Sequence, residues 1–305
     1  MDIKISVIIP NYNHKVYLEQ RINSVLNQTF QEFEVIILDD CSNDDSKAII
    51  ENYRANEKVT HIIYNESNSG STFKQWKKGI SLAKGEWIWI AESDDFADSK
   101  FLEITMDKAN THNDLSIIYC ASEDVNERGL CQGQNSWSED IEARDWSKDY
   151  YYPGKNEIED CMFYKCTIPN ASAVVFKKEN IDQDIFPDLI KMRFAGDWLF
   201  WIKLLEEGSV YYIASTLNYF RYHQDTTRTS KSPELELKRS QEIFKILRYI
   251  KKTYNVSWDY KKHNWLLNEW FHRRRHYKQS LFVNFIPFQY IIILFIKNLK
   301  SPFYK

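Results

Sequence analysis

The sequence predicts an α/β fold: a mostly parallel, Rossmann-like central sheet flanked by helices, followed by a C-terminal helical extension. Over the first 120 residues, short apolar runs alternate with helical patterns, which indicates successive βαβ units. Right-handed crossovers then place helices on both faces of the sheet. After Pro233 the pattern becomes helical and basic. We therefore expect a sheet domain at residues 1–230 and a basic helical extension at residues 231–305.

The predicted elements follow from hydrophobic periodicity. The expected strands are Ile5–Ile9, Phe33–Leu38, Thr60–Tyr64, Trp87–Ala91, Leu115–Cys120, Ala171–Phe176 and Val210–Arg221. The expected helices are Tyr17–Asn27, Ser46–Asn56, Phe73–Ala83, Lys100–Asn110, Asp197–Glu207, Glu234–Tyr254 and Trp265–Gln279. Residues 126–168 are polar, aromatic and irregular. A long segment of that kind in a compact domain is typical of a functional region.

Composition narrows the class of protein. The chain is 43% hydrophobic and 27% charged, which is typical of a folded domain and not of a disordered one. Its five cysteines are irregularly spaced, which argues against a disulfide framework and predicts a reducing, cytoplasmic environment. The apolar run Ile5–Ile9 is too short for the core of a signal peptide, so none is expected.

The extension is strongly basic. Residues 238–305 hold fifteen Lys or Arg against three Asp or Glu. The apolar run Leu281–Ile296 falls short of a membrane-spanning helix, but next to Arg273–Arg275 it predicts a shallow, peripheral contact with an anionic membrane. The alternative is a helical subdomain packed on the core or on a second subunit. Nucleic-acid binding is not predicted, because no recognised module is present.

Polar and acidic groups follow the predicted strands, and ligands of an open α/β sheet bind beyond the carboxyl ends of its strands. The first strand leads into Pro10–Asn13, the second into Asp39 and Asp40, and the fourth into Glu92–Asp95. Three carboxylates within the four residues of that last segment repel one another unless a positive charge lies among them. Mg²⁺ or Mn²⁺ suits this role, because hard cations prefer oxygen ligands and bridge to phosphates. No Gly-rich dinucleotide or P-loop motif is present, so a metal–diphosphate site is the better interpretation.

Four segments in order resemble the family 2 glycosyltransferases with the GT-A fold, and the resemblance covers about residues 3–225. The segments are Ser6–Asn13, Leu38–Ser42, Asn68–Thr72 and Lys84–Asp95. The family inverts the configuration at the anomeric carbon. The resemblance also implies a nucleoside-diphosphate-sugar donor and a divalent metal.

Position by position, the resemblance implies roles for the nucleotide and metal residues. Pro10, Tyr12 and Asn13 belong to the nucleotide site, with the Tyr12 ring beside the base and Asp39 accepting the base N–H. Asp94 and Asp95 match the metal and ribose motif, with Asp95 as the direct metal ligand.

The sequence departs from the family pattern at two points. Glu92 stands where many members have Asp, which puts direct metal ligation by Glu92 in doubt. The Ala-Arg-Asn that many members carry after Gly70 is replaced, so the contact of that Arg cannot be transferred. Lys74 or Lys78 is close enough in sequence to take a phosphate, although an exposed helix face explains both lysines equally well.

Two downstream motifs complete the resemblance. Gly196-Asp197-Trp198 resembles the acidic motif that starts an acceptor-side helix, which implies that Asp197 is the general base. A carboxylate that stabilises a helix N-terminus is the alternative interpretation. Arg221-Tyr222-His223 resembles the Arg-x-His motif, with Arg221 pairing with phosphate and His223 ligating the metal or touching the diphosphate.

A competing general base is an acid of the irregular segment, such as Glu139 or Asp145, although neither belongs to a recognisable motif.

The predicted function is therefore inverting transfer of a sugar from a nucleoside-diphosphate sugar to a hydroxyl of a glycan or lipid-linked glycan, in cell-surface polysaccharide biosynthesis. Two other classes remain open. A nucleotidyltransferase would carry a Gly-rich basic loop where this chain has Pro10–Asn13. A non-catalytic nucleotide-sugar or glycan binder is disfavoured because both Asp95 and Asp197 are present.

Overall fold

The computed structural model describes residues 3–223, 232–276, 286–288 and 290–292, and leaves out the side chains of residues 271–276. The chain divides into two compact units, one of Met1–Lys191 with Gly196–Thr226 and one of Met192–Ala195 with Thr227–Lys305. Each unit is described by itself. The predicted boundary at residue 230 falls outside the described residues and stays a prediction.

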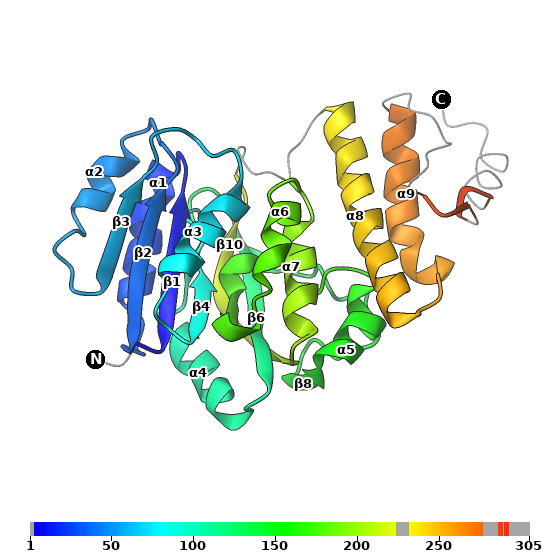
Figure 1. The fold of residues 1–305 in the computed structure, drawn as a ribbon, viewed down its shortest axis with the longest axis horizontal. Coiled ribbons are helices and arrows are strands. Elements are labelled where there is room, and N and C mark those ends of the chain that lie inside the picture. The colour runs from blue at the N-terminus through cyan, green and yellow to red at the C-terminus, as the bar shows by residue number, and fades with distance from the viewer. Residues whose placement is uncertain (1–2, 224–231, 277–285, 289, 293–305) are drawn as a thin grey trace. The chain divides into compact units, whose positions relative to one another are not determined.

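The first unit is built on one ten-stranded sheet with the order β3–β2–β1–β4–β9–β6–β10–β5, with β7 paired to β6 and β8 to β10 (Figure 1). Its strands are β1 Ile5–Asn11, β2 Phe33–Asp39, β3 Val59–Tyr64, β4 Trp87–Ile90, β5 Phe96–Ala97, β6 Leu115–Val125, β7 Cys131–Gln134, β8 Tyr150–Pro153, β9 Val174–Lys177 and β10 Ser209–Arg221.

The sheet is mixed. Strands β1 to β4 are parallel, and β6 and β10 are parallel to each other. The short strand β9 runs antiparallel to both β4 and β6, so β6 and β10 point in the same direction as β4. The carboxyl ends of β1, β2, β4, β6 and β10 therefore lie at one edge, which we call the carboxyl edge. The predicted α/β fold with a mostly parallel sheet and flanking helices is confirmed.

Helices cover both faces of this sheet (Figure 1). One face carries α1 Lys15–Leu26, α2 Ser46–Glu51 and α4 Phe101–Thr111, whose apolar side chains pack with the alternate β1 residues Val7 and Ile9. The other face carries α3 Thr72–Leu82, α6 Phe186–Leu189 and α7 Gly196–Leu205. A Cβ added at Gly79 of α3 would lie 2.4 Å from Ile8 Cγ2, so glycine allows α3 to approach the strand this closely.

The irregular stretch contains more regular structure than the sequence predicts. It holds β7, β8, the short helix α5 Gly154–Glu157 and a π-helical turn at Ile158–Met162. The strand expected at Ala171–Phe176 begins only at Val174. The side chain of Asn170 accepts a hydrogen bond from Ser172 N at 2.8 Å and holds Ala171–Ala173 in a 3₁₀ turn, which delays the strand.

The second unit contains α8 Pro233–Tyr254 and α9 Tyr260–His276. Within this unit the Glu242 carboxylate of α8 accepts hydrogen bonds from the backbone N–H groups of residues 193, 194 and 195 at 2.9, 2.7 and 3.1 Å. Most of the apolar run Leu281–Ile296 lies outside the described residues. In the part of the chain that is described, no helix combines the length and apolar character needed to cross a membrane.

Candidate functional site

The loops after β1 and β2 are joined by hydrogen bonds at the carboxyl edge. Asp39, at the end of β2, is buried and accepts from Asn11 Nδ2 at 2.8 Å and from Ser42 N at 2.9 Å. The Ser42 hydroxyl in turn accepts from the backbone N–H of Asn13 at 2.9 Å. Asn13 has a positive φ of 57°, a conformation that asparagine tolerates better than most residues. These bonds place Pro10, Tyr12 and Asn13 beside Asp39, as expected for one ligand-facing loop pair.

The Tyr12 side chain at this edge is 44% exposed, so its ring is available to a ligand. Lys74, in the first turn of α3, is exposed and donates to Ser69 O at 2.8 Å. Neither observation assigns a ligand, and the nucleotide roles of both residues stay predictions. The neighbouring Asp40 has a structural role, because it accepts hydrogen bonds from side chains that include Asn65 at 2.6 Å and Gln75 at 2.8 Å.

The two aspartates after β4 face different surroundings. Asp95 is only 2% exposed, and its carboxylate accepts from Arg221 N at 2.9 Å and from Asn170 Nδ2 at 3.2 Å. Asp94 instead accepts from His223 Nε2 at 3.0 Å. The structure therefore turns Asp95 into the protein interior and Asp94 toward the histidine. Direct metal ligation by Asp95 stays a prediction that this arrangement does not support.

A buried arginine compensates part of the negative charge of this turn. Arg21 of α1 is fully buried, donates from Nε to Glu92 O at 2.8 Å and places its NH2 4.0 Å from Asp95 Oδ2. Burial lowers its pKa to about 10, although the neighbouring carboxylates favour the charged form. Arg21 therefore supplies part of the positive charge that offsets the carboxylates of this turn, a role that the sequence alone suggests for a metal ion.

Arg221, which the sequence predicts to be a phosphate ligand, is 1% exposed and engaged inside the protein. Its Nε donates to Asp94 O at 2.7 Å, and its NH2 donates to Gln20 Oε1 at 2.6 Å. Its NH1 donates to the carbonyl oxygens of residues 126 and 127 at 3.1 and 3.0 Å. These contacts tie the acidic turn, α1 and the end of β6 together, so Arg221 is positioned as a brace. Its phosphate role stays a prediction.

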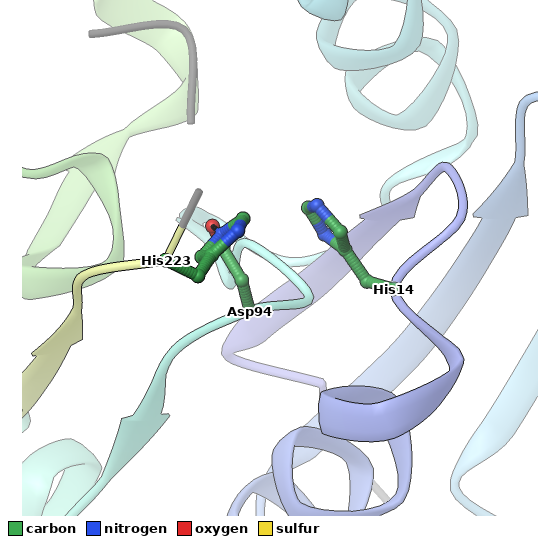
Figure 2. A group of neighbouring side chains, drawn as sticks. All are labelled: His14, Asp94 and His223. Atoms are coloured by element: carbon green, nitrogen blue, oxygen red, sulfur yellow. Dashed lines mark hydrogen bonds and ion pairs between the residues drawn. The ribbon is translucent and has the colours of Figure 1, made fainter. Parts of the chain in front are cut away.

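His14, Asp94 and His223 form the one group of possible metal ligands found among the described residues. Their ligand atoms all lie within 4.8 Å of one another. Figure 2 shows Asp94 and His223 side by side, with His14 facing them from the loop after β1. His14 Nδ1 also lies 2.8 Å from Ser93 Oγ, which fixes the orientation of its ring.

The donor set of this group fits a divalent transition metal. It offers two imidazoles and one carboxylate, and the 3.0 Å between His223 Nε2 and Asp94 Oδ2 is about the separation of adjacent ligand atoms that each bind one ion at about 2.1 Å. Mg²⁺ prefers all-oxygen sites, so the two imidazole donors suit a divalent transition metal better.

The electrostatics of the acidic turn separate its three carboxyl groups. Burial and the nearby Asp94 raise the pKa of Glu92 to about 8, although Trp76 Nε1 donates to it at 2.9 Å. Burial and Asp94 also raise the pKa of Asp95. Burial acts in the same direction on Asp94, but the hydrogen bond from His223 and the charges of His14 and His223 outweigh it and lower its pKa. Asp94 is therefore the member of the turn best suited to remain a carboxylate.

Asp197 lies in the first turn of α7, where its carboxylate accepts a hydrogen bond from Trp198 N at 2.8 Å. Helix α7 ends at Leu205, and β10 then starts at Ser209, which pairs with Leu115 at the beginning of β6. The C-terminus of α7 is therefore at the amino edge of the sheet. Helix α7 lies along β6 (Figure 1), so its N-terminus with Asp197 points toward the carboxyl edge.

Comparison with known proteins identifies the family. The family model for glycosyl transferase family 2 matches residues 6–168, more than half of the chain, and spans β1 to β6 with the loops that carry His14, Asp39 and Asp94. The chain belongs to glycosyl transferase family 2. The resemblance noted from the sequence motifs is thereby confirmed.

Two relatives are glycosyltransferases by name. The chain is 26% identical over 229 residues to the GalNAc(5)-diNAcBac-PP-undecaprenol beta-1,3-glucosyltransferase of Campylobacter jejuni, covering 75% of this chain and 68% of the relative. It is 28% identical over 212 residues to the putative teichuronic acid biosynthesis glycosyltransferase TuaG of Bacillus subtilis, covering 68% and 74%.

A solved structure confirms the fold. That of Staphylococcus aureus TarS in complex with UDP-GlcNAc matches with a TM-score of 0.62 at 22% identity, covering 90% of this chain and 73% of that one.

Two residues of this family 2 site escape the sequence analysis. His14 lies one residue beyond the Pro10–Asn13 motif, and its place after a strand end was a usable signal. Arg21 occupies the apolar face of α1 with Leu18, Ile22 and Val25, so an arginine at a core position of the helix was the second signal. A charge at such a position requires a buried partner, here the acidic turn.

Proposed function

We propose that this glycosyltransferase moves a sugar from a uridine-diphosphate sugar to a hydroxyl of a glycan acceptor, with inversion at the anomeric carbon, in the synthesis of a cell-surface polysaccharide. The observation that carries the proposal is the family 2 match over residues 6–168, which include β1, β2, β4 and β6 of the carboxyl edge. The TarS structure in complex with UDP-GlcNAc supports the choice of uridine. The names of the relatives, with undecaprenol-linked and teichuronic acid products, support a surface or lipid-linked glycan as acceptor.

In the proposed donor site, the loops after β1 and β2 bind the nucleoside. The Tyr12 ring stacks on the uracil, since it is exposed at the carboxyl edge and aromatic faces suit flat bases. Asp39 accepts the base N–H, which its oxygens can do in addition to the bonds from Asn11 and Ser42, because each carboxylate oxygen has two acceptor sites.

We assign the metal site to His14, Asp94 and His223, whose side chains would hold a divalent ion. Mn²⁺ suits this mixed set better than Mg²⁺. When bound, the ion supplies Lewis-acid stabilisation of the negative charge that develops on the leaving diphosphate. Arg21 and Arg221 then have a supporting role, since they hold the acidic turn in place from inside the protein.

Asp197 is assigned as the general base. Inversion by a single displacement requires a carboxylate that takes the acceptor hydroxyl proton as the oxygen attacks the anomeric carbon. The direction of α7 supports this role, because it points the N-terminus of the helix toward the same edge as Asp94. The helix dipole stabilises a negative charge in the first turn of a helix, where Asp197 lies.

Peripheral contact with an anionic membrane remains part of the proposal for the basic extension. A lipid-linked acceptor, as in the name of the Campylobacter relative, is presented at a membrane surface. The residues that would make the contact, Arg273–Arg275 and most of Leu281–Ile296, are not described in their side chains.

The direct test is a panel of nucleotide sugars assayed for release of the nucleoside diphosphate with Mn²⁺, with Mg²⁺ and with EDTA. We expect hydrolysis of one or a few uridine-diphosphate sugars, strongest with Mn²⁺. Turnover of guanosine-diphosphate or thymidine-diphosphate sugars alone would contradict uracil as the nucleobase of the donor. Retention of the anomeric configuration in the transferred product, measured by NMR, would contradict the inverting mechanism.

A further inference from the structure

A cavity of about 310 Å³ lies in the first unit, and its lining includes none of His14, Asp94 and His223. Its walls come from the middle of β6, from residues 134–147 of the irregular segment, from Thr167 and Pro169, and from Tyr212 of β10. Its volume falls at the lower end of the range for small-ligand pockets. No role for this cavity follows from the donor site described above. We call it the β6 pocket.

We propose that the β6 pocket binds an uncharged sugar residue of the acceptor glycan. The inference rests on the proposed function, since it takes the carboxyl edge as the donor site. It adds a location for the acceptor and its chemical class, namely a neutral saccharide and not one that carries phosphate or a carboxylate at the bound unit.

The lining has the mixture of groups that recognises a sugar. Trp146 and Tyr212 form an aromatic corner, with ring centroids 5.5 Å apart in an edge-to-face arrangement. Aromatic rings offer apolar area to the C–H faces of a sugar. Around them stand side chains that exchange hydrogen bonds with hydroxyl groups, including Ser122, Gln134 and Glu139. A few placed polar groups in an aromatic pocket are the usual means of fixing a small ligand.

The charges of the pocket favour a neutral ligand. Arg144, the cation of the lining, has its NH2 3.1 Å from the buried Glu157 carboxylate and its guanidinium 3.7 Å from the centre of the Tyr152 ring. The Arg144 guanidinium is therefore already engaged by protein groups and does not offer its charge to a ligand. Asp145 is paired with Lys148 at 2.8 Å. Glu139 has no cationic side chain within ion-pair distance in the part of the chain that the structure describes.

An anionic sugar would therefore face the Glu139 carboxylate without a cation left to balance it. A neutral sugar instead donates its hydroxyls to that carboxylate, and hydrogen bonds to an ionised acceptor are the stronger kind. This difference gives the pocket its expected selectivity.

Short connections join the β6 pocket to the carboxyl edge. Asn135, in its wall, donates to Asp124 Oδ1 at 2.7 Å near the end of β6. Pro169, also in its wall, is followed by Asn170, which donates to Asp95 at 3.2 Å. The pocket thus adjoins the edge at which sugar transfer is proposed. A sugar held there lies on the acceptor side, where the next hydroxyl can approach the donor.

The test is saturation-transfer NMR on the full chain with UDP and Mn²⁺ present, so that the donor site is occupied. The probes are neutral saccharides, N-acetylglucosamine, N-acetylgalactosamine and glucose disaccharides, against glucuronic acid and N-acetylglucosamine 6-phosphate. We expect saturation of at least one neutral saccharide and none of the two anionic sugars. Glu139→Gln removes the charged hydrogen-bond acceptor, so the affinity for the neutral saccharide should fall about tenfold. Trp146→Phe should weaken it less than Trp146→Leu, because it keeps an aromatic ring.

Glu142→Gln is the matched control, because it removes the same charge at an exposed position outside the pocket. Thermal unfolding confirms that each variant is folded, and calorimetry with UDP and Mn²⁺ should give the same affinity in all of them. Absence of UDP binding in the wild type would contradict the proposed donor site. The saturation of saccharides would still test the β6 pocket, because it does not depend on UDP binding. The pocket proposal is overturned if no neutral saccharide is saturated, if the anionic sugars bind as well, or if Glu139→Gln and Trp146→Leu bind like the wild type.

Discussion

The backbone N–H of Arg221 donates a hydrogen bond of 2.9 Å to the carboxylate of Asp95, across 126 positions of the chain. This bond joins the turn after β4 to the last residue of β10, and His223 follows two residues later. Because His223 contacts Asp94, the neighbour of Asp95, the short stretch at and just after the end of β10 both supports the acidic turn and supplies a candidate metal ligand. The buried Asp95 therefore helps to hold Asp94 and His223 in position.

Replacing Asp95 should chiefly cost stability. Asp95→Ala leaves the Arg221 N–H unpaired and the fully buried Arg21 without its nearest carboxylate. Breaking a buried charge pair typically costs about 3–5 kcal/mol. We expect a loss of that order in the free energy of unfolding, measured by urea denaturation. Asp94→Ala is the control and should cost less, because its side chain is 19% exposed. Equal stability of Asp95→Ala and wild type would contradict the bracing role.

Arg221 should behave as a structural group as well. Arg221→Lys keeps the charge but has no planar fork, so it cannot reach Asp94 O, Gln20 and the carbonyls after β6 together. With about 1 kcal/mol for each net hydrogen bond lost, the melting temperature should fall by several degrees. The exposed Arg128→Lys is the matched control. If Arg221→Lys melts normally but binds UDP poorly, the arginine contacts phosphate and the sequence-based prediction holds.

The metal should be required for donor binding through the histidine group. Chelation with EDTA should abolish most of the UDP affinity in calorimetry, and Mn²⁺ should restore it better than Mg²⁺. His14→Ala removes one candidate ligand and should weaken Mn²⁺-dependent binding by at least about tenfold. His112→Ala is the control, since His112 precedes β6 at the opposite edge of the sheet. UDP binding that is indifferent to EDTA would exclude a bridging metal.

The fold followed from local patterns more readily than the site did. The strand over Ile5–Ile9 and the one starting at Val210 were predictable because buried strands read as continuous apolar runs. A strand at β9 was also expected, but its antiparallel direction was not predictable, since nothing in its own four residues indicates the direction of its neighbours. Asp94 and Asp95 were recognisable as a motif, but their opposite orientations depend on Arg21 and Arg221, which are distant in sequence.

Stability should also depend on pH through Glu157. Burial, only partly offset by Arg144, raises the pKa of this carboxyl above its usual value. Between the unfolded and the folded pKa the folded protein binds more protons, so its free energy of unfolding falls as pH rises. As pH rises above about 4.5, we expect the free energy of unfolding of the wild type to fall relative to that of Glu157→Gln. Above the folded pKa of Glu157, the difference between the two proteins should level off. A difference that is constant with pH would show that Glu157 is not shifted.

The assignment of Asp197 as general base predicts a loss of turnover without a loss of donor affinity. Asp197→Asn keeps the shape of the side chain and its acceptance of the Trp198 N–H, but it removes the proton affinity. General-base catalysis typically contributes about 10²–10⁴-fold, so transfer, measured as UDP released only when an accepting saccharide is added, should fall by that factor. Calorimetry with UDP and Mn²⁺ should be nearly unchanged, because the base acts on the acceptor.

Asp188→Asn is the control for Asp197→Asn, since Asp188 is an acid in the first turn of the neighbouring helix α6. If Asp197→Asn transfers within about threefold of wild type at saturating substrates, well short of the loss expected for a general base, the base lies elsewhere. Glu139 and Asp145 would then be the first candidates, because both line the β6 pocket that is proposed to hold the acceptor. In that case Glu139→Gln or Asp145→Asn should lose the turnover that Asp197→Asn retains.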